Sequence, residues 1–89
     1  MRVVGGELVG GEGVLRRAEL VEVTLADSSP AVNRTLAELA MPRSATIVAV
    51  VREERVMVPS KDMVLRAGDE VVALITEDAE AAVTKILVG

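Results

Sequence analysis

The amino-acid sequence predicts an α+β domain in which a small mixed β-sheet is capped by a C-terminal helix. Two observations lead to this prediction. Residues 45–51 carry no formal charge and are mostly β-branched, a run too short for a stable helix and the right length for a buried strand. Residues 77–88 instead repeat apolar side chains at helical spacing. With the elements before and between these two runs, the expected order is β-α-β-β-β-α.

Composition narrows the possible functions. Hydrophobic residues make up 51% of the 89-residue chain, yet it has no Phe, Trp or Tyr, so the core must be built from small aliphatic side chains. A second copy covering one face would add burial that such a core lacks. The net charge of −4 and the absence of aromatic rings argue against a nucleic-acid partner. The absence of His and Cys leaves no imidazole base or thiolate, and we expect no enzyme activity.

Residues 1–17 hold five of the seven glycines. The spacing of Gly5 and Gly10 resembles a P-loop, but Gly11-Glu12 stands where a Lys and a hydroxyl residue would be needed to reach phosphate and magnesium. We therefore expect 1–17 to be a flexible or hairpin-like lead-in or linker. The folded domain is expected to span 18–89.

The first half of that domain predicts a strand and a short helix. Residues 18–26 alternate between two faces, which is typical of a half-buried strand, and Ser29-Pro30 belongs to the turn that follows it. Thr35 and Glu38 have the spacing of a capping box, in which each side chain bonds the other's backbone amide. This box should open a short helix over 36–40, which Pro42 closes.

The second half predicts a hairpin, a strand and the closing helix. Residues 45–51 should form the central strand of the sheet, because they carry almost nothing that favours water on either face. They pair with residues 56–58 through a tip at Glu53-Glu54. A further strand is expected over 70–75, and Thr76 is a suitable N-cap for the helix over 77–88.

With these elements placed, the chain resembles the TrkA-C family, the C-terminal domain of regulators of potassium conductance (RCK-C). The matching segments have the order and spacing of that family over about residues 18–88. They are Glu19-Leu-Val-Glu-Val-Thr24, Ser29-Pro30, Thr35-Leu-x-Glu-Leu39, Pro42-Arg43, Ile47-Val-Ala-Val-Val-Arg52, Val58-Pro59 and Asp62-x-Val-Leu-x-Ala-Gly-Asp69.

The resemblance implies a cytoplasmic, homodimeric, ligand-sensing domain. Such a domain would lie at the membrane through a partner and gate a potassium channel, a Trk/Ktr-type transporter or a cation/proton antiporter. A Rossmann-type RCK N-terminal domain usually precedes this module, and 1–17 does not resemble one. Some members bind cyclic di-AMP at the dimer interface. The alternative is a purely structural homodimerisation module without a ligand of its own.

The resemblance also locates a candidate ligand site between the short helix and the strand that follows it. Its residues would be Arg43, Ser44, Ala45, Thr46, Ile47 and Val48. An arginine can hold a phosphate through two hydrogen bonds. This chain departs from the cyclic-di-AMP-binding pattern, because Met41 replaces an Asp, the loop is shorter and Thr46 stands in place of an Asn. The competing interpretation of Arg43 is a solvated side chain paired with Glu38 or Asp62.

Other polar and sulfur-containing residues have a structural and a functional interpretation. Glu53 and Glu54 form either a solvated hairpin tip or half of a calcium or magnesium site. Asp62 and Asp69 are expected to accept hydrogen bonds from backbone amides beside Gly68. Three methionines fill the core or form an adaptable binding surface. They are Met41, Met57 and Met63.

Overall fold

The computed structural model describes residues 1–11 and 14–89, with side chains described at 1–5 and 18–89. Five strands form one sheet in the order β1-β2-β5-β3-β4. The strands are β1 Arg2–Gly11, β2 Val14–Thr24, β3 Ala45–Arg52, β4 Arg55–Met57 and β5 Glu70–Thr76. The helical elements are the 3₁₀ turns η1 Ala37–Leu39 and η2 Glu77–Ala79 and the helix α1 Glu80–Leu87.

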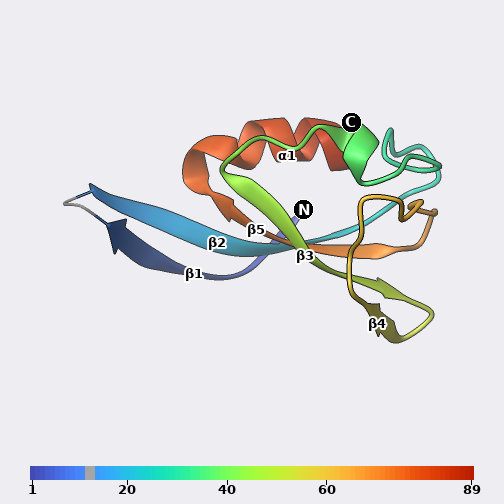
Figure 1. The fold of residues 1–89 in the computed structure, drawn as a ribbon, viewed down its shortest axis with the longest axis horizontal. Coiled ribbons are helices and arrows are strands. Elements are labelled where there is room, and N and C mark those ends of the chain that lie inside the picture. Colours follow the sequence, from blue (N-terminus) through green and yellow to red (C-terminus); the bar gives the residue numbers. More distant parts are fainter. Residues whose placement is uncertain (12–13) are drawn as a thin grey trace.

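The predicted α+β class with a C-terminal capping helix is confirmed. Helix α1 lies across one face of the sheet, and the green segment that contains η1 lies on the same side (Figure 1). From β2 onward, the elements follow the expected order β-α-β-β-β-α, with a 3₁₀ turn in the place of the first helix.

The prediction of a mixed sheet is wrong, since each strand pairing among the described residues is antiparallel. Strands β2 and β3 run in the same direction, since each is antiparallel to β5. They do not form a parallel pair, because β5 lies between them in the sheet.

The prediction that residues 45–51 form the central strand is also wrong. Strand β5 is central, and β4 pairs with β3 only over Val50–Arg52. The first half of β3 is consequently an edge among the described residues. Its apolar character does not mean burial on both faces, because within β3 only Val50 is fully buried and Val48, at a β-bulge, is 44% exposed.

The core lies between the sheet and α1. Along β2 and β5 every second side chain faces the helix, so residues such as Val21, Val71 and Ile75 are almost completely buried. Val83 and Leu87 of α1 meet them from above. The opposite side chains of β5 are less protected, and Leu74 is 43% exposed. One sheet face is thus packed, and the described residues leave the other face uncovered.

The N-terminal lead-in contributes a strand to the sheet. Strand β1 pairs with β2 from Arg2 opposite Glu22 to Gly11 opposite Val14, whereas β5 covers only 18–24 of β2. The far part of this hairpin therefore extends beyond the rest of the sheet (Figure 1). Residues 12 and 13 of the predicted lead-in lie outside the described residues. The boundary between a lead-in and a domain at residue 18 stays a prediction.

The short helix and the helix start differ from the sequence prediction in detail. The capping box forms, since the Thr35 amide donates to Glu38 Oε1 at 2.9 Å and the Glu38 amide donates to Thr35 Oγ1 at 3.3 Å. It opens only the 3₁₀ turn η1, because so few residues cannot offset the cost of nucleating an α-helix. At the second helix start, the Thr76 hydroxyl bonds the Asp78 carboxylate and not a backbone amide.

Candidate functional site

A cavity of about 260 Å³ opens beside the first half of β3, which pairs with β5 but not with β4. We call it the β3 pocket. Its walls come from η1 and the residues around it, from the start of β3 and from the segment after β4. The lining residues are Leu36, Ala37, Met41, Ala45, Thr46, Ile47, Pro59, Ser60 and Lys61.

The β3 pocket contains half of the candidate site predicted from the sequence. Ala45, Thr46 and Ile47 line it. Ser44 instead accepts a hydrogen bond from the Thr76 amide at 2.9 Å through its carbonyl, which fixes the start of β3 against β5. Val48 lies at the β-bulge of β3 and does not line the pocket. The structure therefore brings three of the six predicted residues together.

Arg43 is exposed in the turn before β3 and does not line the pocket. The expected pairing of Arg43 with Glu38 or Asp62 is not found among the described residues. Glu38 instead accepts hydrogen bonds from Thr35 and lies 3.7 Å from Arg34. These bonds, first that from the Thr35 amide, hold the pKa of Glu38 below its usual value. The Glu38 carboxylate is therefore already occupied at the start of η1.

Backbone hydrogen bonds position the walls of the β3 pocket. The Ala37 amide donates to the Lys61 carbonyl at 3.2 Å, and the Leu36 amide donates to the Met63 carbonyl at 3.1 Å. An isolated bridge between Thr35 and Val64 continues this pairing. Residues 35–37 and 61–64, which are far apart in sequence, are thereby hydrogen-bonded to each other on one side of the cavity.

The wall formed by Pro59, Ser60 and Lys61 was not predicted to belong to the site. Sequence periodicity offers no signal for it, because these residues lie in an irregular segment whose place depends on tertiary hydrogen bonds. The family-like pair Val58-Pro59 was the available clue. Met41 both lines the pocket and packs against the core, so its two interpretations overlap, and Met63 packs against the core.

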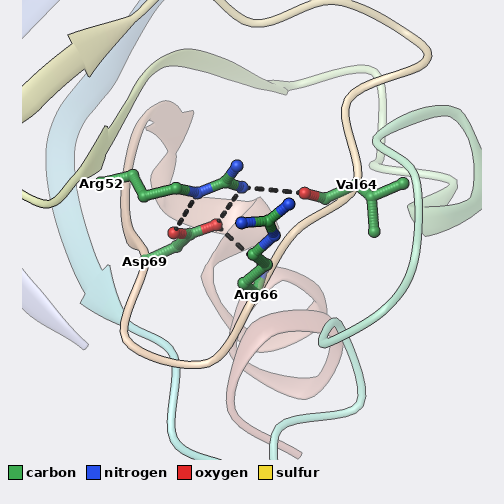
Figure 2. Close-up of polar contacts among 4 residues, drawn as sticks. All are labelled: Arg52, Val64, Arg66 and Asp69. Carbon is green, nitrogen blue, oxygen red and sulfur yellow. Dashed lines mark hydrogen bonds and ion pairs between the residues drawn. The ribbon is translucent and has the colours of Figure 1, made fainter.

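A polar cluster outside the β3 pocket joins Arg52 and Asp69, and we call it the Arg52–Asp69 clamp (Figure 2). The Arg52 guanidinium donates to both carboxylate oxygens of Asp69, at 2.8 and 2.7 Å, and to the Val64 carbonyl at 2.9 Å. The Arg66 amide donates to Asp69 Oδ2 at 2.9 Å. This last bond confirms the expected role of Asp69 toward a backbone amide. For Asp62 no such bond is found among the described residues.

The clamp is buried and fully engaged. The side chain of Asp69 is 2% exposed and that of Arg52 is 18% exposed. The hydrogen bond from Arg52, and next that from the Arg66 amide, outweigh burial and hold the pKa of Asp69 below its usual value. The turn is also tied to β2, since the Leu25 amide donates to the Asp69 carbonyl at 2.9 Å. A carboxylate occupied in this way is a structural group and not a base.

The hairpin tip at Glu53-Glu54 has the predicted position. Both residues are exposed, and their φ angles of 50° and 65° place them in the left-handed region. Two such residues between the paired Arg52 and Arg55 make a type I′ turn, which Asn and Gly prefer. Among the described residues, no cluster of three or more acidic side chains is arranged to hold a metal ion. A half-site at the tip that a second copy would complete stays a prediction.

No helix formed by the described residues has the length and apolar character needed to cross a membrane.

Comparison with known proteins identifies similar domains. The TrkA-C domain model matches residues 20–88. The Trk system potassium uptake protein TrkA of Mycobacterium tuberculosis is 37% identical over 71 residues, which are 80% of this chain and 32% of that protein. The chain therefore spans about a third of the length of this relative.

Solved structures agree with the sequence match. The RCK_C domain dimer of S. agalactiae BusR in complex with c-di-AMP has a TM-score of 0.65 and 25% identity, covering 76% of this chain and 93% of that chain. S. agalactiae BusR in complex with its busAB-promotor DNA has a TM-score of 0.66 and 25% identity, covering 76% of this chain and 35% of that chain. The family model matches residues 20–88 of the 89-residue chain, and the chain has the fold of RCK C-terminal domains. The chain therefore belongs to the TrkA-C domain family.

Proposed function

We propose that this chain is a ligand-sensing, dimer-forming regulatory domain of a potassium transport system, and that it binds cyclic di-AMP in the β3 pocket. One observation carries the proposal. The pocket is built around Ala45, Thr46 and Ile47, which belong to the ligand site that the family resemblance implies. The similar BusR domain is a dimer in complex with c-di-AMP.

The size of the pocket supports a shared ligand. At about 260 Å³ it lies below the ~300–1,000 Å³ typical of sites that enclose a whole small molecule. A cyclic dinucleotide has two bases and two phosphates related by two-fold symmetry. Two facing copies of the pocket would each hold one half of it, giving one ligand for two chains.

The uncovered sheet face supports dimerisation as well. Leu74 is 43% exposed at the centre of the sheet, and Leu20 and Val72 beside it are only half-buried. An apolar face of this kind is a common site of association. A second copy would supply the burial that the aliphatic core of this small domain lacks.

The alternative function, a structural homodimerisation module without its own ligand, also has an observation in its favour. Arg43, the arginine expected to hold a phosphate, is exposed and lies outside the pocket. Under this alternative the domain would dimerise in the same way with and without nucleotide.

The proposed transport partner is supported by the similarity to TrkA and not by the geometry of the pocket. In this proposal the domain lies on the cytoplasmic side of the membrane, attached to a channel or transporter subunit through a longer protein with a Rossmann-type RCK N-terminal domain. BusR, whose complex contains promoter DNA, is only 35% covered by the matched region. With a net charge of −4 and no aromatic residue, we expect this domain itself to make no DNA contact. The proposal assigns it no catalytic reaction.

Isothermal titration of the chain with cyclic di-AMP, with mass measured by light scattering, tests the proposal. We expect saturable binding at one ligand per two chains. Ala37→Met should block it, because Ala37 is exposed and lines the pocket. The matched control is Ala82→Met, at an exposed position of α1 outside the pocket. A ligand-free dimer that shows no binding would support the structural alternative, and a strict monomer without binding would contradict both functions.

A further inference from the structure

The charged residue that lines the β3 pocket lies outside the site predicted from the sequence. Of the described residues that line it, Lys61 is the single charged one, and no carboxylate is among them. The remaining surface is mainly apolar, with the hydroxyl residues Thr46 and Ser60. A ligand that matches this lining has an apolar portion and a negative charge.

The backbone of Lys61 is held in place while its ammonium group is left available. The Lys61 carbonyl accepts the Ala37 amide at 3.2 Å, and the neighbouring Ser60 carbonyl accepts the Met63 amide at 3.1 Å. Lys61 takes part in none of the side-chain hydrogen bonds or ion pairs among the described residues. The adjacent Asp62 does not line the pocket.

Arg43 has the opposite arrangement. It is exposed in the turn before β3 and forms no wall of the cavity. The mobile ammonium of a lysine can reach a phosphate as a point charge, without the fixed two-bond geometry of an arginine. Met41, two residues before Arg43, adds an apolar side chain to the pocket wall, so this part of the wall supplies no charge.

We propose that Lys61, and not Arg43, supplies the positive charge that holds the ligand phosphate in the β3 pocket. This proposal rests on the proposed function and makes it more specific. The ligand of the pocket is then a phosphate-bearing nucleotide, and Lys61 makes the pocket prefer this nucleotide over the neutral nucleoside.

The test compares cyclic di-AMP binding by the wild-type chain, Lys61→Gln and Arg43→Gln at two salt concentrations. A hydrogen bond to a charged group is worth enough that Lys61→Gln should weaken binding by about tenfold or more. It should also reduce the salt dependence, whereas Arg43→Gln should change the affinity less than about twofold. Lys85→Gln removes an exposed lysine of α1 outside the pocket and is the matched control.

The outcomes separate this proposal from the proposed function. Tight binding that Arg43→Gln abolishes and Lys61→Gln leaves intact would overturn the role of Lys61 and preserve the function. If the wild type does not bind cyclic di-AMP, the proposed ligand is wrong, and AMP and adenosine become the probes. A preference for AMP that Lys61→Gln removes would then support the role of Lys61. Equal affinity for the two probes, or no binding of either, would overturn it.

Discussion

The Arg52–Asp69 clamp and the β3 pocket contact different parts of the segment 58–65, and they differ in how their charged residues are used. In the clamp, a buried carboxylate accepts hydrogen bonds from one guanidinium and one backbone amide. In the pocket, a lysine and two hydroxyl residues line an open cavity, and the lysine has no charged partner among the described residues. The first arrangement stabilises the fold, and the second leaves capacity for a ligand.

The two regions are also mechanically connected. Arg52 bonds the Val64 carbonyl, and Val64 bridges Thr35 beside η1. The same segment provides Pro59, Ser60 and Lys61 to the pocket. The Arg52–Asp69 ion pair thus helps to fix the segment whose other part forms a wall of the β3 pocket. A charged residue that stands out in the sequence, such as Arg43, therefore does not by itself identify the region that binds a ligand.

Asp69→Asn should break the clamp and have the largest effect. Removing one partner of a buried ion pair leaves the other charge poorly compensated, and because Arg52 keeps some solvent contact we expect a loss of about 3 kcal/mol in the free energy of unfolding. Urea unfolding followed by circular dichroism measures it. The control Asp62→Asn, at an exposed position, should change stability by less than about 0.5 kcal/mol. Equal effects of the two substitutions would show that the clamp is not structural.

Acid should weaken the same region. Because the pKa of Asp69 is lowered in the folded state, its contribution to stability is fully present above the unfolded-state pKa of about 3.9 and is lost as pH falls through the lower folded value. Urea midpoints measured from pH 6 to pH 3 should therefore fall more steeply for the wild type than for Asp69→Asn. Parallel curves would contradict the assigned pKa shift.

The hairpin tip offers a gain in stability at residues outside the β3 pocket. Residues with a side chain are strained at positive φ, whereas Asn-Gly favours a type I′ turn. The double substitution Glu53→Asn and Glu54→Gly should raise the free energy of unfolding by about 1 kcal/mol. Cyclic di-AMP binding should not change, because neither residue lines the β3 pocket. Weaker binding in this variant would mean that the tip takes part in ligand recognition.

The smallest stability effect is expected within the pocket. Thr46 is exposed and lines the cavity, so Thr46→Val should change the free energy of unfolding by less than about 0.5 kcal/mol. A much larger loss would place Thr46 among the residues that stabilise the fold, and the contrast between the two regions would fail at this position. The same urea unfolding experiment decides between these results.

Local patterns predicted the elements well because their signals are local. The alternation in β2, the capping box of Thr35 and Glu38 and the hairpin tip each depend on neighbours within a few residues. Sheet order was not predictable in the same way. An apolar run such as Ile47–Val51 indicates burial without saying whether the cover comes from this chain or from another one. The exposed Val48 and Leu74 show why β3 was wrongly placed at the centre.

The candidate site was predicted in part for a similar reason. Ala45, Thr46 and Ile47 were found through their place in a family-like segment, and the same resemblance named Arg43, which the fold directs elsewhere. Lys61 was missed because its position depends on a hydrogen bond to Ala37 across a long stretch of sequence. Which side chains share a cavity is a tertiary property.

Amide chemical shifts of the ¹⁵N-labelled chain during a titration with cyclic di-AMP test the division between the two regions most directly. We expect the largest shifts on residues 36–37, 45–47 and 60–61, which line the β3 pocket. The amide chemical shifts of Arg66, Gly68 and Asp69, in the turn that carries the clamp carboxylate, should change little. Shifts centred on the clamp turn, or none at saturating ligand, would contradict the assignment of binding to the pocket and of stability to the clamp.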